Sequence, residues 1–277
     1  MKFALGTIDV PVFLRSSWKP VFAAALVESG LIERFGLTPK ELAVVAGSHA
    51  GEPGHVAAVR SILEKSGVPE SALRCGEPGR AILHNCSGKH AGLLAFARMR
   101  GESLADYLDP AHPAQAALRS YCERLIRETI SPDATAIDGC GFPVYAVTLR
   151  TAAAAFARLA SGESEPLRVV RDAMRREPWY VAGTDRFDTD VMRETGAIVA
   201  KGGAEGVFLA GDTRTGRGFA LKVIDGNSRA VAPAAVALFR RVDALYGREF
   251  EAVRRYAEPM LRNVSGTVIG SIRAIAD

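Results

Sequence analysis

The sequence predicts an α/β fold in which an antiparallel or mixed sheet is packed with helices. Three short β-prone runs follow one another at 197–201, 207–210 and 218–223, and a hairpin turn at 212–216 joins the last two, which makes that pair antiparallel. Helix patterns outnumber strands along the rest of the chain. No internal repeat or linker is visible, and no strand leads into a glycine-rich dinucleotide-binding turn. We therefore expect residues 1–277 to form one domain without a doubly wound sheet.

The first residues predict a short extended segment followed by a buried helix. Residues 10–14 are apolar and β-prone but contain Pro11, which is typical of an edge strand. The serines that follow suit a helix cap, and the helix continues as an apolar run to about residue 28. Ser16 and Lys19 are three residues apart, so they would lie on one face of this helix.

A capping box starts the next helix, and a turn of small residues follows it. Thr38 and Glu41 form the capping box, with a proline at the first helical position. The apolar run 42–46 leads into residues 47–52, whose small side chains allow the backbone and the Ser48 hydroxyl to approach a ligand. An amphipathic helix is predicted from Pro53 until a glycine stops it at residue 67.

The most chemically crowded stretch is residues 84–92. It brings a thiol, a hydroxyl, an ammonium group, two imidazoles and two glycines to the start of one helix. Ser87 is the predicted cap of that helix, because its hydroxyl can accept from the free N–H groups of the first turn. Basic residues in the last turn and Gly101 after it predict the end of the helix.

The remaining elements follow from the same signals. We expect strands at 134–137, 144–149 and 264–275 besides the three already named, and helices at 113–128, 151–160 with Thr151 as its cap, 166–176, 189–194 and 229–246.

Composition excludes several classes of function. A hydrophobic content of 48% and a charged content of 24% are ordinary for a globular protein. The net charge of +4 is spread along the chain without a basic block, so nucleic acid is not an expected partner. No apolar run approaches the roughly 20 residues of a membrane span, and the N-terminus lacks a signal-peptide core. Together with four scattered cysteines, this predicts a cytoplasmic protein with reduced thiols and no membrane partner.

Two hydroxyl–lysine sets are candidates for nucleophilic catalysis. Serine becomes a good nucleophile when a neighbouring group removes its proton. A lysine one helical turn away can remove it if burial leaves the amine neutral, so Ser16 and Lys19 are a candidate nucleophile and base. The alternative is a capping serine and a solvated lysine. Ser48 is either a second reactive hydroxyl or an ordinary cap, and Lys201, at the end of a strand, reaches either a cleft or solvent.

A third set consists of Cys86, Lys89 and Cys140. Cys86 and Lys89 share a helix face, and Cys140 lies in a glycine-flanked turn near Asp138. Two thiolates are good zinc ligands, and a neutral lysine adds a nitrogen. The alternatives are a nucleophilic Cys86, activated by the helix N-terminus and its basic neighbours, or two buried thiols without a chemical role.

These motifs, taken together, resemble the rhizobial-type, or class 3, L-asparaginases, also called the asparaginase II family. The matching stretches, in family order, are Leu14-Arg15-Ser16-Ser17-x-Lys19-Pro20, Ser48-His49-x-Gly51-Glu52-Pro53, Asn85-Cys86-Ser87-Gly88-Lys89-His90-x-Gly92, Asp138-Gly139-Cys140-Gly141-x-Pro143 and Gly196-Ala197-x-x-x-Lys201-x-Gly203. The resemblance implies a fold similar to serine β-lactamases and glutaminases, a homodimer, and hydrolysis of L-asparagine to L-aspartate and ammonia.

The resemblance also implies roles for individual residues. Two Ser–Lys tandems would carry the chemistry, Ser16 with Lys19 and Ser48 with Lys201. Zinc, which tunes substrate binding more than it performs hydrolysis, would be held at Cys86, Lys89 and Cys140. The residues expected to contact the substrate are Arg15, His49, Asn85, His90 and Asp138.

Two departures from the family pattern matter. Members usually carry a longer N-terminal segment with another strand, so a sheet edge is expected to lie open here. Some members have a further cysteine where this chain has Asp188, which is expected to change the electrostatics near the thiols. Three alternative functions remain open. The first is an asparagine-binding protein without turnover, and the second is another serine amidase. The third is a β-lactamase-like or transpeptidase-like enzyme that uses only Ser16 and Lys19, which the absence of an export signal disfavours.

Overall fold

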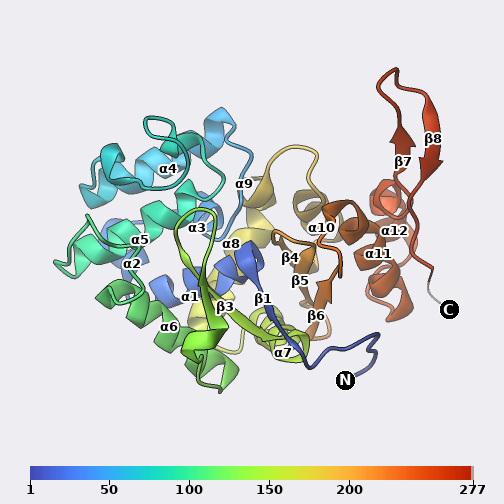
Figure 1. The fold of residues 1–277 in the computed structure, drawn as a ribbon, viewed down its shortest axis with the longest axis horizontal. Coiled ribbons are helices and arrows are strands. Elements are labelled where there is room, and N and C mark those ends of the chain that lie inside the picture. Colours follow the sequence, from blue (N-terminus) through green and yellow to red (C-terminus); the bar gives the residue numbers. More distant parts are fainter. Residues whose placement is uncertain (276–277) are drawn as a thin grey trace.

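The computed structural model describes residues 1–275, in which helices surround three small antiparallel sheets (Figure 1). The α-helices are α1 (Lys19–Glu28), α2 (Leu31–Phe35), α3 (Pro39–Val45), α4 (Pro53–Ser66), α5 (Ser87–Met99), α6 (Pro113–Ile126), α7 (Leu149–Ser161), α8 (Glu165–Arg176), α9 (Pro178–Ala182), α10 (Phe187–Thr195), α11 (Val231–Arg241) and α12 (Gly247–Val253). Short 3-10 helices are η1 (Arg15–Trp18), η2 (Glu70–Ala72), η3 (Ala81–Leu83), η4 (Pro132–Ala134), η5 (Ser228–Ala230) and η6 (Arg254–Tyr256).

The strands are β1 (Pro11–Phe13), β2 (Thr135–Ile137), β3 (Pro143–Thr148), β4 (Ile198–Gly202), β5 (Val207–Asp212), β6 (Arg217–Lys222), β7 (Met260–Arg262) and β8 (Val268–Ser271). They pair in the orders β1-β3-β2, β4-β5-β6 and β7-β8, always antiparallel. The predicted α/β class with antiparallel pairing is therefore confirmed, although the strands of residues 1–275 divide among three sheets.

Helix α1 lies at the centre of the helical part of the molecule. It packs against α5, α6 and α8, and its residues from Lys19 to Leu26 are buried. The predicted capping box starts α3: Thr38 accepts the N–H of Glu41, and the Glu41 carboxylate accepts the Thr38 N–H at 2.6 Å. Helix α3 in turn contacts α4, α5, α8 and α9, so the turn that follows it is held among several helices.

The β4–β5–β6 sheet forms the other side of the site. Strand β5 is buried along its whole length, and α7 covers β5 and β6. The contact with α7 is very close at Gly218, where an added Cβ would lie 1.8 Å from the Ala153 carbonyl oxygen. The 3-10 helix η1 contacts β4 and β5, which brings the start of α1 against this sheet.

Two predicted helix caps are wrong by a few residues. Ser87 is the first residue of α5 rather than its cap, and its hydroxyl donates instead to the Ile82 carbonyl at 2.9 Å. Thr148, rather than Thr151, caps α7, because its side chain accepts the Thr151 N–H at 3.0 Å. The observed N-caps, Cys86 and Thr148, lie one and three residues before the predicted ones, a difference that sequence patterns do not resolve.

The C-terminal part differs most from the prediction. The helix expected at 229–246 is α11, which ends at Arg241, shortly before Asp243 takes a left-handed φ of 55°. The single strand expected at 264–275 is the hairpin β7–β8, which projects from the body (Figure 1). Helix α9 was not predicted. Its five residues are too few to show a helical period.

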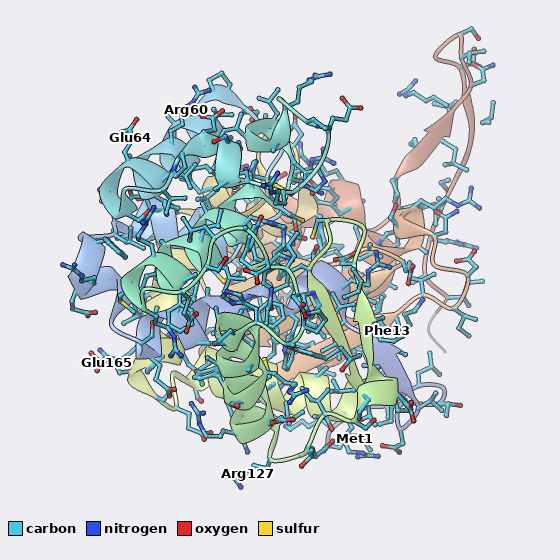
Figure 2. The ribbon with its side chains drawn as sticks, turned by 60° about the vertical axis from the view of Figure 1, so that its left-hand side comes forward. Met1, Phe13, Arg60, Glu64, Arg127 and Glu165 are labelled. Carbon is cyan, nitrogen blue, oxygen red and sulfur yellow. The ribbon has the colours of Figure 1, made fainter. Side chains whose placement is uncertain are left out.

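Charged side chains lie on the outside of the molecule. Arg60, Glu64, Arg127 and Glu165 are exposed and point outward (Figure 2). This agrees with the interpretation that the charges spread along the chain form a solvated surface. Within residues 1–275, no helix has the length and apolar character that crossing a membrane requires.

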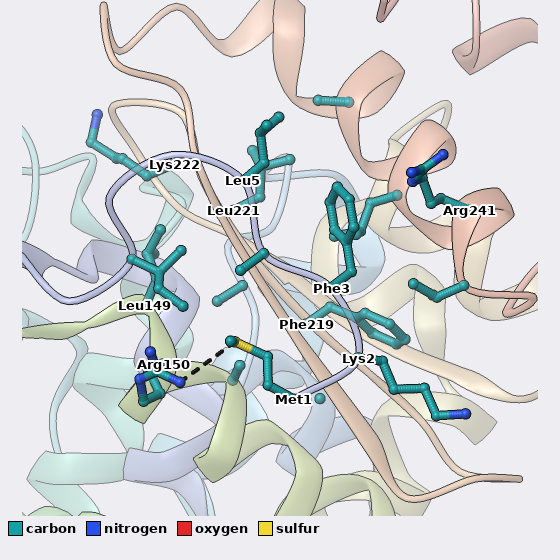
Figure 3. Close-up of a pocket in the computed structure, with 18 of the residues that line it drawn as sticks. Met1, Lys2, Phe3, Leu5, Leu149, Arg150, Phe219, Leu221, Lys222 and Arg241 are labelled. Carbon is teal, nitrogen blue, oxygen red and sulfur yellow. Dashed lines mark hydrogen bonds between the residues drawn. The ribbon is translucent and has the colours of Figure 1, made fainter. Parts of the chain in front are cut away.

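A cavity of about 790 Å³ lies beside β6 (Figure 3). The N-terminal residues Met1, Phe3 and Leu5 extend over it, and its other walls come from α7, β6 and α11. Strand β6 pairs with β5 on one side only, so it is an edge strand of this sheet. None of the predicted catalytic residues lines this cavity.

Candidate active site

Lys19 is buried with its amine surrounded by oxygen atoms. Its side chain enters the core at the start of α1 and is 1% exposed. Nζ contacts the Gly47 carbonyl at 2.6 Å, the Ser48 hydroxyl at 2.9 Å and the Asn85 carbonyl at 3.4 Å. Burial lowers the pKa of Lys19 to about 8, because desolvation disfavours the ammonium form. Two of the three directions around Nζ therefore meet carbonyl oxygens, and the third meets a hydroxyl.

The hydrogen bond of Lys19 joins one residue from each of the two predicted tandems. Lys19 forms its hydrogen bond with Ser48 and not with Ser16. The Ser16 hydroxyl makes no hydrogen bond within residues 1–275, and its side chain is partly exposed in η1. The residue that contacts the Lys19 amine is 29 positions away in the sequence.

His49 holds the turn that carries Ser48. Its Nδ1 accepts the Gly51 N–H at 3.1 Å, and its Nε2 lies 3.0 Å from the Ser87 hydroxyl, which itself donates to Ile82. Nε2 therefore carries the proton. Burial lowers the pKa of His49 to about 3, so the ring is neutral. With both nitrogens engaged, His49 supports the turn and offers a substrate no free polar atom, unlike the predicted contact.

Close packing also fixes this turn. An added Cβ at Gly47 would lie 2.6 Å from the Val181 carbonyl, and one at Gly88 would lie 2.3 Å from the Val44 carbonyl. The Ser48 N–H donates to Val181 at 2.7 Å, and the His49 N–H donates to Asn85 at 3.2 Å. The turn after α3 is thus clamped between α5 and α9, which sets the position of the Ser48 hydroxyl.

Lys201 projects from β4 and is also buried, at 1% exposure. Its Nζ donates to the Gly202 carbonyl at 2.5 Å and lies 3.6 Å from the Asp188 carboxylate. Burial lowers its pKa, and the Asp188 charge opposes that shift. The sequence-based alternative of a solvated Lys201 is therefore wrong. A tandem of Lys201 with Ser48 stays a prediction.

The two thiols Cys86 and Cys140 lie together with Lys89. Cys86 and Cys140 are 4% and 5% exposed, and Lys89 donates to the Cys140 sulfur at 3.5 Å. A hydrogen bond from Cys140 lowers the pKa of Cys86, and the same bond raises the pKa of Cys140. The Lys89 amine also lies 3.7 Å from the centre of the Phe142 ring. Cys75 and Cys122 are buried and free, as predicted for small hydrophobic residues.

Arg15 and Asp138 form an ion pair next to these groups. Arg15 Nε and Nη2 both contact Asp138 Oδ1, at 3.0 and 2.6 Å, and Nη1 contacts Glu205 at 2.5 Å. Asp138 Oδ1 also accepts the N–H of Gly139 at 2.7 Å. Arg15 has a φ of 52°, a left-handed conformation that costs a non-glycine residue energy and is typical of functional sites.

The other two predicted substrate contacts differ in accessibility. Asn85 is exposed, and the atom it places against Lys19 is its backbone oxygen rather than its amide. His90 is completely buried behind Phe142, with Nδ1 2.7 Å from the Tyr107 hydroxyl. Its Nε2 is buried without a hydrogen-bond partner among residues 1–275. A role for His90 in substrate contact stays a prediction.

Three residues of this site escaped the sequence analysis in their actual roles. Ser87 was assigned to capping but bonds to His49, and Asp188 was expected near the thiols but contacts Lys201. Glu205, the partner of Arg15, lies in no recognisable motif. Each is identified by a partner distant in the chain, which no local spacing reveals.

Comparison with known proteins agrees with this constellation. The family model described as L-asparaginase II matches residues 1–274. No curated protein matches the chain. Since the family model covers nearly the whole sequence, including every motif that builds the site, the chain belongs to the L-asparaginase II family.

Proposed function

We propose that this protein hydrolyses the side-chain amide of L-asparagine to give L-aspartate and ammonia. The family supports an amidohydrolase of the asparaginase type. The observation that carries the proposal is the Lys19 amine, buried and 2.9 Å from the Ser48 hydroxyl. In its neutral form the amine has two N–H bonds for the Gly47 and Asn85 carbonyls, which leaves the lone pair directed at Ser48. Lys19 thus suits a general base for Ser48.

The reaction then follows through an acyl-enzyme. Ser48 Oγ bonds to the amide carbon while its proton passes to Lys19. When the tetrahedral intermediate collapses, the carbon–nitrogen bond breaks and Lys19 returns the proton to the departing ammonia. A water molecule, deprotonated by Lys19, attacks the ester and releases aspartate and the free serine.

We expect the hydrogen bond that stabilises the oxyanion to come from a group outside the turn that carries Ser48. The N–H groups of Ser48 and His49 are both engaged with carbonyls. The Ser16 hydroxyl has no such partner within residues 1–275, so we assign it the stabilising hydrogen bond. For the rest of the substrate, Arg15 suits the carboxylate and Asp138 the ammonium group, because opposite charges attract over short distances.

Further features of the family resemblance accompany this proposal. The Ser-x-x-Lys motif lies at the start of a buried helix, where it packs against an antiparallel sheet. This arrangement supports a fold related to serine β-lactamases and glutaminases. A single domain, a homodimer and a cytoplasmic location stay predictions from the sequence.

An ammonia-release assay with asparagine and glutamine tests the function directly. We expect the wild type to prefer asparagine, and Ser48→Ala to lower the rate at least about 10³-fold. Ser16→Ala should lower it about 10²-fold, as for loss of one oxyanion donor. An electrophilic asparagine analogue should label Ser48 in the wild type and in Ser16→Ala, as peptide mapping by mass spectrometry would show.

Other outcomes would point elsewhere. Labelling of Ser16 instead would reverse the two serine roles. A melting temperature that rises with asparagine while no ammonia appears would indicate a binding protein without turnover. Acylation by a labelled β-lactam, without amidase activity, would favour the β-lactamase-like alternative.

We further propose that Cys86, Lys89 and Cys140 are able to hold zinc near the substrate. With usual Zn–S and Zn–N bond lengths, two ligands of a tetrahedral zinc lie about 3.5 Å apart, which is the separation of Lys89 Nζ and Cys140 Sγ. The residues therefore fit the metal. No cluster of three or more His, Cys, Asp or Glu side chains suited to a metal occurs in residues 1–275, so the site depends on Lys89 as third ligand. Bound zinc would supply a Lewis acid that orients a substrate oxygen.

Metal analysis of protein purified without chelator tests this set. We expect about one zinc per chain in the wild type and a loss of most of it in Cys140→Ala, because removal of one of three ligands weakens the site severely. Cys122→Ala, which removes a buried thiol outside the site, should keep its zinc. Equal, near-zero zinc in all three proteins would exclude the metal.

A further inference from the structure

The two buried lysines of the site have different electrostatic surroundings. Lys19 meets two carbonyls and a hydroxyl, and no carboxylate of residues 1–275 contacts it. Lys201 lies 3.6 Å from the Asp188 carboxylate. Since both side chains are 1% exposed, burial alone does not distinguish them. The difference between them is the acidic partner of Lys201.

Asp188 is held firmly in this position. It lies in the first turn of α10, where the positive end of the helix dipole favours a carboxylate. Its Oδ2 accepts the Gly202 N–H at 2.7 Å, so strand and helix share this contact. A Cβ at residue 202 would lie only 3.2 Å from Oδ1, which explains how a glycine there permits the approach. The Asp188 side chain is 14% exposed, so water screens its charge weakly.

Lys201 lies on β4, which contacts η1, the short helix that leads into Lys19. The residue after Gly202, Gly203, packs so tightly on η1 that an added Cβ would lie 3.0 Å from the Ser17 nitrogen. The charge of Lys201 is one of the influences that lower the pKa of Lys19. The charged groups that influence Lys201 are Asp188 on α10 and Cys86 beside α5. Around Lys19, the charges of Cys86 and Cys140 raise its pKa, whereas those of Lys89 and Lys201 lower it.

We propose that Asp188 is a positioning residue whose ion pair holds Lys201 as a cation beside the Ser48–Lys19 pair, so that the two lysines divide their tasks. Lys201 supplies a fixed positive charge. Lys19, which has no carboxylate partner among residues 1–275, is kept neutral by burial and by repulsion from Lys89 and Lys201, and takes up the serine proton. This inference rests on the proposed amide hydrolysis for its catalytic consequence, whereas the charge state of Lys201 does not depend on turnover.

The first test measures the lysines directly. Lysine labelled with ¹³C at Cε is titrated by NMR in the wild type and in Asp188→Asn, with Lys201→Met used to assign the signal. Asparagine still accepts the Gly202 N–H but carries no charge, so we expect the Lys201 titration to move down by about 1 pH unit or more. Glu194→Gln, an exposed charge change on the same helix, should leave it in place. An unchanged Lys201 titration in Asp188→Asn would overturn the proposal.

The second test measures activity against pH. Loss of the Lys201 charge removes the repulsion that lowers the Lys19 pKa, so the acid limb of kcat/KM should move to higher pH in Asp188→Asn. A direct effect of Asp188 on Lys19 would move the limb in the opposite direction, because removal of a negative charge disfavours a nearby ammonium. In a Lys201→Met background, Asp188→Asn should change kcat/KM less than twofold.

The two failures are distinguishable. If the wild type releases no ammonia, the proposed function is wrong, and the NMR titration still decides the charge of Lys201. If the wild type is active and Asp188→Asn lowers kcat/KM as strongly with Lys201→Met present as without it, Asp188 acts by another route and the inference is wrong.

Discussion

Replacement of Lys19 by methionine is expected to lower kcat/KM for asparagine at least about 10³-fold. Methionine fills a similar volume but cannot take the proton from Ser48, whose hydroxyl lies 2.9 Å from the amine. The Gly47 carbonyl would also lose the donor that fixes it at 2.6 Å. The measurement is steady-state ammonia release, with a thermal melt to confirm that the variant is folded.

Two further variants test whether Lys19 acts as a base or only as a positive charge. Lys19→Arg keeps a positive charge but cannot be deprotonated near neutral pH, so it should be nearly as inactive as Lys19→Met. Lys40→Met, at an exposed lysine that makes no hydrogen bond or ion pair among residues 1–275, should keep full activity. Substantial activity in Lys19→Arg would show that Lys19 acts as a cation and that another group is the base.

The same assignment predicts a pH profile. The pKa of Lys19 is lowered to about 8, and the reactive form is the neutral amine. In the wild type kcat/KM should therefore rise about tenfold per pH unit below that value and level off above it. A profile that falls as pH rises through 8 would contradict a lysine base.

Replacement of Gly218 by alanine is expected to be the most destabilising single methyl addition in the sheet. The new Cβ would lie 1.8 Å from the Ala153 carbonyl oxygen and 2.5 Å from the Ala157 nitrogen, both backbone atoms of α7. Backbone cannot turn aside as a flexible side chain does, so α7 must move off β6. We expect a loss of about 3 kcal/mol in the free energy of unfolding, measured by denaturant titration.

A matched control is available at Gly139. A Cβ there meets no atom within 4 Å, and the residue is exposed. Gly139→Ala should therefore change the unfolding free energy by less than about 0.5 kcal/mol. Equal stability of Gly218→Ala and Gly139→Ala would show that α7 does not pack on β6 as described.

Local signals predicted the elements that carry strong caps or stops. The capping box at Thr38 and Glu41 starts α3 as expected, and the left-handed Gly67 ends α4. The hairpin between β5 and β6 also forms where predicted, with Asp212 accepting from Arg214 and Thr215 in the turn. These features depend on residues within a few positions of one another, so they can be predicted directly from the sequence.

Prediction failed where the competing interaction comes from elsewhere in the chain. The helix expected at 229–246 stops at Arg241, and the C-terminal strand folds back as β7–β8. The hydrogen bond between Lys19 and Ser48, which was not predicted, spans 29 positions in the sequence. Because such contacts depend on how helices pack, no spacing rule identifies them.

The sequence by itself determined which reactive groups this protein has and which family it belongs to: two serines, three lysines and two thiols in motifs whose order matches the L-asparaginase II family. The tertiary structure decided which of these groups act together. It placed Lys19 against Ser48, gave Lys201 a carboxylate partner in Asp188, and engaged both nitrogens of His49. The physical reason is burial. A lysine amine or an imidazole acquires its charge and direction from the few atoms that replace water around it, and those atoms come from distant segments.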